Sequence, residues 1–442
     1  MISDFINLDK NLKIPIYFQI YAELKKAIEN GSIKENEKIP SVRKLCSDLN
    51  VSKSTVENAY GLLRAEGYII NVPKKGYYVE KGILIDKRTG KSDAAKRTVK
   101  RYKYDFSGKG IDKNCTNIKE WRKYVKDILN REYLLNTYSD NQGEEELRLA
   151  LSKYSFSTRG VNADSGNIVI GSGSQTLIFI LCGILGLNKT AAIEKNSFPQ
   201  AEQVFSDYNY KIKYTDSDEL GITVESLNRI KPDILMINPN FISINGGTVP
   251  IKRKIEIINW AKDNGCLIIE DDYNGEMRYK THPKTCMQSL APEQVVYIGS
   301  FSKILLPSVR ITYFVLPDSL IIKYNKVKEF YNQTTSKIEQ LALSRYISEG
   351  KLEKYLRKSR RYYLSKSENM RKTVEGCSFS YIFNETSMYF EIQFKDNMLK
   401  KCEKLSLKPM RTSTETRIKL NFSQIDEEFI DEALIKLSKE IK

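Results

Sequence analysis

The chain has 442 residues, and its 71 Lys and Arg against 55 Asp and Glu give a net charge of +16, which suits a polyanionic partner. Apolar residues at 41% and charged residues at 29%, with 23 Gly and 12 Pro, exclude a disordered or collagen-like chain, and the length predicts two or three domains. The only histidine, His282, disfavours enzymes that need a Ser-His-Asp triad or a multi-histidine metal site.

The seven cysteines indicate a reducing compartment, because they are odd in number, widely spaced and contain no C-x-x-C pair. We therefore expect neither disulfides nor a metal site. The first residues, MISDFINLDKNLK, lack the basic and apolar regions of an export signal, which predicts a cytoplasmic protein. Residues 168–187 are apolar over a membrane-crossing length, but the GSGSQT near their start and the strand-like NIVI before it favour buried core.

Residues 1–80 predict a helical domain that ends in a hairpin. Apolar residues recur at helical spacing from residue 14 until Gly31, a residue that often ends helices. Two shorter helices should begin after Ser41 and Ser52, because serine is a favoured N-cap, and the tight LNVS turn between them makes a helix-turn-helix. The following YIINVPKKGYYVE alternates apolar residues around a turn, which predicts a wing of two strands.

The helix starts and the wing tip carry hydroxyl and basic residues, which in a helix-turn-helix hold phosphates and base edges. The elements PSVRKL, VSKSTVENAY and EGY resemble the winged helix-turn-helix of the GntR family, over residues 14–79. The resemblance implies that Arg43, Lys53 and Thr55 contact the operator and that Gly76 lets the wing backbone approach the minor groove. The alternative is a plain helical bundle with a solvated basic face. The predicted DNA-binding residues are Ser41, Arg43, Ser52, Lys53, Thr55, Lys74, Lys75 and Gly76.

Residues 81–104 differ in composition from both neighbouring segments. Lys and Arg recur there among Gly, Ser and Ala without an apolar period, which predicts a flexible basic linker. From residue 105 to 442, short β-branched runs alternate with helical stretches. This alternation predicts an α/β fold, with a mostly parallel seven-stranded sheet covered on both faces and a small C-terminal α+β domain. The expected strands are 167–170, 190–194, 211–215, 233–238, 266–271, 295–299 and 311–316.

Polar residues follow several of these strands, at the sheet edge where ligands of this fold class bind. Asp271 and Tyr273 follow one strand, and Ser300, Ser302 and Lys303 follow the next. Most lysines are simply solvated. Lys303 differs because it stands directly after a strand and small hydroxyl residues.

A phosphate cup is expected at the same edge. The glycine-serine turn before Ser174 and Gln175 would present backbone N–H groups at a helix start, and Ser302 with Arg310 could complete the cup. A carboxylate such as Asp271 could keep a pyridine nitrogen protonated, so that the ring withdraws electrons from an amine bound to it.

The blocks YSDNQGEEELR, RGV, IEDDYNGEMRY and GSFSKILLPSVR resemble the fold-type-I aminotransferases that use pyridoxal 5′-phosphate, over residues 105–442. Together with the GntR-like head, the whole chain resembles the MocR-type transcription regulators. The resemblance implies three catalytic residues: Lys303 as the Schiff-base lysine, Asp271 beside the pyridine nitrogen and Tyr273 near the ring hydroxyl. It also implies Ser174, Gln175, Ser302 and Arg310 as phosphate ligands, Ser300 as a further cofactor-binding residue, Phe198 as the aromatic residue stacked on the ring, and Arg417 as the ligand of an effector carboxylate.

Two stretches depart from the family pattern. The segment NPNFISINGG places Phe241, Ile242, Ile244 and Asn245 where the family commonly has a histidine, an amide residue and a Pro-Thr-Gly turn. Gln200 stands where some members have a second carboxylate-binding arginine. Fewer polar contacts to the ring should slow proton transfers more than they weaken cofactor attachment, which favours sensing over turnover.

We therefore predict a transcription regulator that uses pyridoxal 5′-phosphate on Lys303 as co-effector and senses an amine, an amino acid or the cofactor itself. The resemblance also implies a head-to-tail homodimer on a double-stranded DNA operator. Two alternatives remain open: a working aminotransferase with an accessory DNA-binding head, and a GntR-type regulator whose body has lost the cofactor. Steady amino-group transfer would favour the first, and a colourless protein whose DNA binding ignores the cofactor would favour the second.

Overall fold

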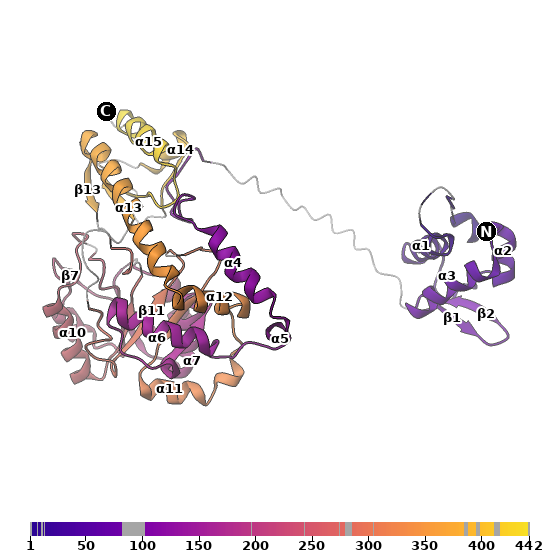
Figure 1. Ribbon diagram of the computed structural model, residues 1–442, viewed down its shortest axis with the longest axis horizontal. Helices are drawn as coiled ribbons and strands as arrows, with labels where there is room; N and C mark the ends of the chain where they lie inside the picture. The colour runs from indigo at the N-terminus through magenta and orange to yellow at the C-terminus, as the bar shows by residue number, and fades with distance from the viewer. Residues whose placement is uncertain are drawn as a thin grey trace. The chain divides into compact units, whose positions relative to one another are not determined.

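The structure of the protein is a computed structural model. It describes residues 2–6, 8–9, 12, 14–81, 102–195, 197–242, 244–273, 275–278, 285–303, 305–383, 388–394, 398–410 and 416–440. These residues form two compact units, divided between Val99 and Lys100 (Figure 1). We call the N-terminal unit the head and the C-terminal unit the body. Most of the expected linker lies outside the described residues, as does His282.

The head contains the expected helices and wing. Helices α1 (Ile16–Glu29), α2 (Val42–Leu49) and α3 (Lys53–Ala65) follow a short 3-10 helix, η1 (Ile2–Phe5). Their apolar faces bury Ile20, Leu45 and Val56 in one core. The antiparallel strands β1 (Ile69–Val72) and β2 (Gly76–Val79) form the wing.

The body is built on a large sheet with the order β4-β12-β11-β10-β9-β5-β6, seven strands in the part of the chain that the structure describes. All neighbouring pairs are parallel except that β12 runs antiparallel to both β11 and β4. The mostly parallel sheet is therefore confirmed. Its strands are β4 (Ile168–Gly171), β5 (Thr190–Ile193), β6 (Lys211–Tyr214), β9 (Ile234–Ile237), β10 (Leu267–Asp271), β11 (Val295–Ser300) and β12 (Thr312–Val315).

Helices cover both faces of this sheet, because successive strand residues point to opposite sides. In β4, Ile168 and Ile170 pack with α6 and α12, whereas Val169 packs with α7. In Figure 1, α4, α6, α12 and α13 lie near the viewer. The helices and short elements of this part are α4 (Ile118–Leu129), α5 (Glu132–Leu135), α6 (Glu145–Arg159), η2 (Ser165–Asn167), α7 (Ser174–Leu185), α8 (Pro199–Asp207), β7 (Ser217–Asp218), β8 (Gly221–Ile222), α9 (Val224–Ile230), α10 (Ile251–Asn264), α11 (Asp318–Asn325), η3 (Lys328–Phe330) and α12 (Lys337–Ser348).

A small α+β domain closes the body, as expected. The long helix α13 (Lys351–Gly376) leads into an antiparallel sheet of β13 (Ser380–Phe383), β14 (Tyr389–Gln393) and β16 (Arg417–Asn421). Helices α14 (Leu399–Lys404) and α15 (Glu427–Lys439) belong to the same domain. The strand β3 (Tyr104–Asp105) pairs with β15 (Leu407–Lys408), so the first residues of the body join its last domain.

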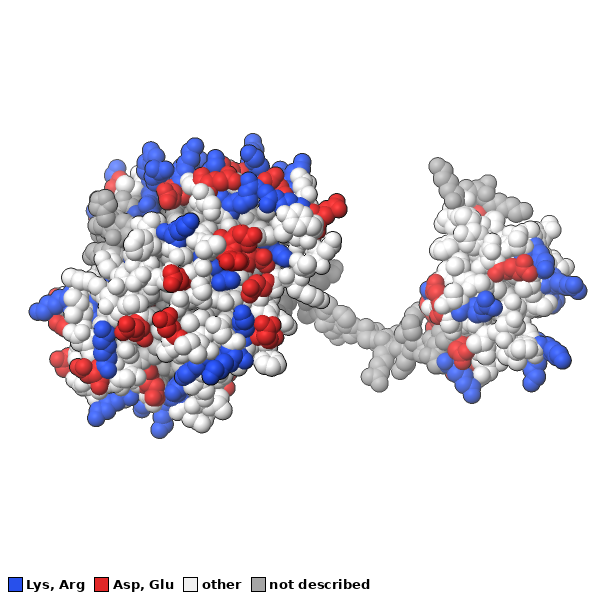
Figure 2. Space-filling view, turned by 60° about the horizontal axis from the view of Figure 1, so that its bottom comes forward, with Lys and Arg blue, Asp and Glu red and all other residues white. Residues whose placement is uncertain are grey.

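The apolar span 168–187 forms the buried strand β4 and the helix α7, as the sequence predicts, with Leu177 and Leu181 fully buried. Within the described ranges, no helix is both long enough and apolar enough to cross a bilayer. Figure 2 shows Lys and Arg side chains interspersed with Asp and Glu over the visible surface of both units.

Candidate functional site

The residues expected to hold a cofactor gather at one edge of the large sheet. Strand pairing places Ser300, at the end of β11, beside Thr312 at the start of β12, and Thr312 beside Gly171 at the end of β4. Asp271 ends the neighbouring strand β10. Because these strand ends share one edge, the turn before α7, the loop of Lys303 and the carboxylate of Asp271 lie near one another: they lie at the ends of β4, β11 and β10, with only β12 between β4 and β11.

Lys303 has the environment of a reactive amine. Its side chain is half-buried, and burial lowers the pKa of its amine below the usual value. Its Nζ donates to the backbone carbonyl of Gly108, and no carboxylate among the described residues forms an ion pair with it. Gly108 has a φ of 66°, and Asn421 fills the space that a side chain there would need. A lowered pKa leaves more of the amine neutral and nucleophilic.

The start of α7 and Arg310 form a cradle for an anion. A Cβ atom on Gly173, the N-cap of α7, would lie only 2.7 Å from an Nη atom of Arg310, so the guanidinium lies directly against the helix start. Ser174 is half-buried and Gln175 is exposed in the first turn. A helix N-terminus and a guanidinium both favour negative charge, and their combination suits a phosphate group.

Hydroxyl groups connect this cradle with the loop of Lys303. The Thr312 hydroxyl donates to Ser300 Oγ at 3.3 Å, and Ser300 Oγ donates to Ser302 Oγ at 3.3 Å. The backbone N–H of Ser302 also donates to Ser300 Oγ, at 3.3 Å. Ser300 therefore stabilises the turn that carries Ser302 toward Lys303.

Asp271 lies among buried carboxylates. Burial raises the pKa of Asp271 to about 7, the charge of Asp272 adds to the shift, and the N–H of Tyr273 opposes it by donating to the carboxylate. Burial also raises the pKa of Glu270 and of Glu276 to about 7. A nearby cation such as a pyridinium would stabilise the ionised form of Asp271. The side chain of Tyr273 is 40% exposed.

Asp272, by contrast, is a fully compensated buried charge. Arg159 donates to its two oxygens from Nε and Nη2 at 2.6 and 2.7 Å, and the two side chains are 0% and 1% exposed. The Tyr297 hydroxyl and Asn240 Nδ2 each donate to the same carboxylate at 2.6 Å. Arg278 in turn donates to Asn240 Oδ1 at 2.8 Å. This network fixes the end of β10, next to Asp271.

Phe198 is the N-cap of α8, and its half-buried ring packs against the apolar cluster on the α7 face of the sheet. Gln200 is exposed on the same helix. Both residues follow β5, so they extend from the same sheet edge as Lys303.

The departing segment NPNFISINGG, residues 238–247, contains three apolar side chains at described positions. Phe241 contacts Tyr389, with ring centroids 5.9 Å apart, and Ile242 is buried at 2% exposure. Ile244 is 48% exposed. Asn245 stabilises its own loop, since its Oδ1 accepts the N–H of Gly247 at 2.7 Å. Asn240 of this segment is buried, at 1% exposure, and donates to Asp272.

Arg417 begins β16, and its Nη1 lies 3.5 Å from a carboxylate oxygen of Glu391. Lys419, on the same face of the strand, also pairs with Glu391, at 3.6 Å, and its Nζ lies 5.1 Å from the centre of the Tyr389 ring. Asn421, two residues further along, contacts the glycine that accepts from Lys303. Lys419 is therefore closer along the strand to the Lys303 site than Arg417 is.

Sequence reasoning missed Lys419, Glu391 and Tyr389, because their proximity depends on the register between β14 and β16. It also missed the pairing of Arg159 with Asp272. Both residues lie within the blocks RGV and IEDDYNGEMRY, but a single sequence carries no signal that joins them.

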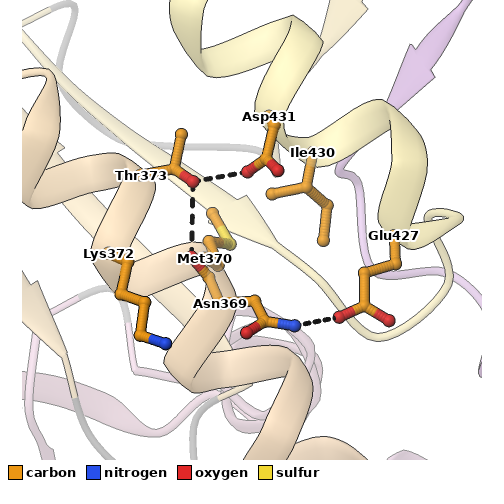
Figure 3. Close-up of a pocket in the computed structure, with 7 residues that line it drawn as sticks. All are labelled: Asn369, Met370, Lys372, Thr373, Glu427, Ile430 and Asp431. Carbon is orange, nitrogen blue, oxygen red and sulfur yellow. Dashed lines mark hydrogen bonds between the residues drawn. The ribbon is translucent and has the colours of Figure 1, made fainter.

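A separate pocket of about 190 Å³ lies between α13 and α15, in the small domain (Figure 3). The Thr373 hydroxyl donates to Asp431, and Asn369 Nδ2 donates to Glu427, so both carboxylates are already bound by the facing helix. None of the expected site residues lines this pocket. Its lining is Asn369, Met370, Lys372, Thr373, Glu427, Ile430 and Asp431.

In the head, Ser41 and Ser52 are the N-caps of α2 and α3, where their hydroxyls accept the N–H groups of Lys44 and Thr55 at 3.3 Å. The hydroxyls of Ser52 and Thr55 also lie 2.7 Å apart. Arg43 is exposed on α2.

Lys53 is exposed at the start of α3, where its Nζ lies 3.3 Å from Glu57. Lys74 and Lys75 are exposed at the wing tip, beside Gly76, whose φ of 106° is one that residues with side chains rarely adopt. Exposed cations thus stand on α2, on α3 and on the wing.

Comparisons with known proteins agree with both units. Residues 16–79 match the family model of bacterial regulatory proteins of the gntR family, and residues 109–437 match that of aminotransferase class I and II. Over 381 residues, the chain is 32% identical to the HTH-type transcriptional regulator YdeL of Bacillus subtilis, covering 85% of this chain and 82% of YdeL. The chain belongs to the GntR-type transcriptional regulators that carry an aminotransferase class I and II domain.

Other relatives of the regulator are more distant. It is 23% identical over 381 residues to the pyridoxine biosynthesis transcriptional regulator PdxR of Corynebacterium glutamicum, covering 85% of this chain and 82% of PdxR. The kynurenine aminotransferase of Pyrococcus horikoshii, solved in complex with PMP, superposes with a TM-score of 0.69 at 24% identity, covering 78% of this chain and 91% of that one. The expected family, fold class and regulatory function are confirmed, and the aminotransferase domain indicates pyridoxal 5′-phosphate as cofactor.

The raised pKa of Asp271 predicts a pH-dependent loss of stability. Its pKa of about 7 in the folded chain lies above the ordinary 3.8, so its ionisation destabilises the fold increasingly as pH rises between these two values. In cofactor-free protein at pH 8, we expect Asp271→Asn to raise the thermal midpoint by at least ~3 °C. The gain should shrink as the pH falls toward 4 and disappear below about pH 3, where the carboxyl is protonated in both the folded and the unfolded chain.

Asp263→Asn is the matched control, because Asp263 is exposed on α10. Its thermal midpoint should follow that of the unaltered chain at every pH. A lower midpoint for Asp271→Asn than for the unaltered chain at pH 8 would contradict the account of this carboxylate.

Proposed function

We propose that this regulator attaches pyridoxal 5′-phosphate to Lys303 and that occupancy of this site controls how the protein binds DNA. The observation that carries the proposal is the meeting, at one sheet edge, of a half-buried amine of lowered pKa, a half-buried carboxylate of raised pKa and a cationic cradle. These are the groups that an aldehyde, a pyridine nitrogen and a phosphate require.

The residues at this edge fit the cofactor. The missing side chain of Gly173 leaves room for Arg310 at the helix start. When bound, pyridoxal 5′-phosphate supplies an aldehyde that condenses with amines and a ring that withdraws electrons from them. We assign the phosphate to Ser174, Gln175, Ser302 and Arg310, with Ser300 holding their turn, the pyridine nitrogen to Asp271, the ring hydroxyl to Tyr273, the ring face to Phe198 and the aldehyde to Lys303.

The chain's own groups favour retention over rapid turnover. Asp272 and Arg159 hold the end of β10 in place, so Asp271 has a fixed position. In segment 238–247, Phe241 packs on Tyr389 and Ile242 is buried, and apolar side chains cannot move protons. These features support a sensor rather than an efficient aminotransferase.

We propose an amine or an amino acid as effector, with the cofactor itself as the other candidate. Arg417, the residue expected to bind an effector carboxylate, shares Glu391 with Lys419. A carboxylate that binds these cations has to compete with Glu391. The effector's amine would displace Lys303 from the cofactor and so shift the population of DNA-binding states.

We further propose that the regulator acts in the cytoplasm as a head-to-tail homodimer. The described cysteines are free thiols, which supports a reducing compartment. Tyr138 and Phe330 are 100% and 85% exposed, and their loops are joined by a hydrogen bond from Asn141 to Glu329 at 3.4 Å. Neighbouring exposed aromatic residues favour burial against a second copy.

Visible absorption tests attachment of the cofactor. The full chain incubated with pyridoxal 5′-phosphate and then desalted should keep a visible band, and Lys303→Ala should lose it because the attaching amine is gone. Lys328→Ala is the control, since Lys328 is another half-buried lysine of the body. A band retained by Lys303→Ala, or a pyridoxyl mass on a different lysine, would overturn the assignment.

The salt dependence of DNA binding tests the head. Lys53→Ala should weaken binding to any duplex and lower the slope of log affinity against log salt by about 1, because one phosphate contact is lost. Lys26→Ala, an exposed lysine on α1, should leave both quantities unchanged. Equal losses in the two variants would show that Lys53 contributes only diffuse charge, and would contradict a phosphate contact from α3.

A further inference from the structure

The positive charge of the body is concentrated on one helix. Residues 105–442 contain 50 Lys and Arg against 43 Asp and Glu, a net charge of +7. Helix α13 alone contains nine Lys and Arg against three Asp and Glu, a net charge of +6. The rest of the body is therefore almost neutral, and nearly all of its excess positive charge lies on α13.

The cations of α13 form a stripe on its outer side. Lys354, Arg357, Lys358 and Arg361 are all exposed, and their spacing puts them on one face over about 10 Å of helix. The opposite side of the helix buries residues such as Leu352, Leu356, Tyr363 and Met370 in the core. The stripe thus points directly away from the body.

Helix α4 carries a second stripe of the same kind. Lys119, Arg122, Lys123 and Lys126 are exposed at the same spacing. The two helices are neighbours, because Glu120 of α4 pairs with Lys351 of α13 at 3.3 Å. A hydrogen bond of 3.4 Å from Asn114, just before α4, to Tyr362 joins them again.

The acidic residues of α4 do not neutralise these stripes. Glu120 is paired with Lys351, and Asp127 is bound by Arg345. Among the described residues, none of the eight stripe cations forms an ion pair. Figure 2 shows many Lys and Arg side chains, with some Asp and Glu among them, along the upper edge of the body. We call these eight residues the α4–α13 basic surface.

We propose that the α4–α13 basic surface binds the phosphate backbone of duplex DNA. The proposal rests on the DNA-binding function of the head, and it adds a second contact from the aminotransferase-like body. A small phosphate ligand needs donors that converge on one point, whereas these cations are spread along two helices, as a chain of phosphates requires. Such contacts carry no sequence preference and raise the affinity for long duplexes.

The test neutralises one stripe in the full chain, by the combined change Lys354→Gln, Arg357→Gln, Lys358→Gln and Arg361→Gln. Binding is measured by fluorescence anisotropy with a duplex of arbitrary sequence about 60 base pairs long, well beyond the spacing of two half-sites. The affinity at moderate salt should fall by about tenfold or more, and the slope of log affinity against log salt by about 2 to 4.

A matched variant removes the same charge elsewhere on the body: Lys252→Gln, Lys262→Gln, Lys323→Gln and Lys326→Gln, all exposed. Its affinity should stay within about twofold of that of the unaltered chain, because only diffuse charge is lost. All substituted residues are exposed, and thermal unfolding verifies that both variants fold.

Equal losses of DNA affinity in the two variants, or no loss in the stripe variant, would overturn the proposed role of the α4–α13 basic surface. Neither result would contradict DNA binding by the head. If the unaltered chain bound no duplex, DNA binding by the head and by the α4–α13 basic surface would both be contradicted. A selective loss in the stripe variant, with the control unchanged, is the result that supports the proposal.

Discussion

The body depends on one buried charge, the carboxylate of Asp272. Taking a carboxylate out of water costs several kcal/mol, and removing one partner of a buried pair typically costs about 3–5 kcal/mol. Here Arg159, Asn240 and Tyr297 supply four donated hydrogen bonds, so the charge is compensated and the end of β10 has one position. Asp271, the last residue of β10, is held in place by this network because it is bonded to Asp272 through the backbone. Its own carboxylate does not bind Arg159, Asn240 or Tyr297 in these hydrogen bonds.

The two adjacent carboxylates differ in role: Asp272 stabilises the fold, and Asp271 is the residue that we propose for the cofactor. Asp272 accepts four hydrogen bonds, whereas burial makes ionisation of Asp271 unfavourable and also disfavours the ammonium form of Lys303. We propose that pyridoxal 5′-phosphate would relieve both unfavourable states, by bringing a pyridinium to Asp271 and an aldehyde to Lys303. Such a relief on binding would suit a protein whose binding states respond to a small molecule.

Much of the fold could be predicted because local rules were sufficient. Ser41 and Ser52 cap their helices, Gly76 takes a backbone angle that favours glycine, and the β-branched runs all became strands of the large sheet. Long-range pairing could not be predicted. The register of β14 on β16 brings Glu391 and Lys419 together, and the contact of Arg159 with Asp272 joins residues 113 positions apart. Only tertiary structure specifies such neighbours.

We propose that the cofactor site of the body controls DNA binding through Lys303. The most direct test of this claim is the affinity of the full chain for duplex DNA, measured with and without pyridoxal 5′-phosphate, for the unaltered protein and for Lys303→Ala. We expect the cofactor to change the affinity of the unaltered protein and to have no effect on Lys303→Ala. An affinity that ignores the cofactor in both proteins, or that changes equally in both, would contradict it.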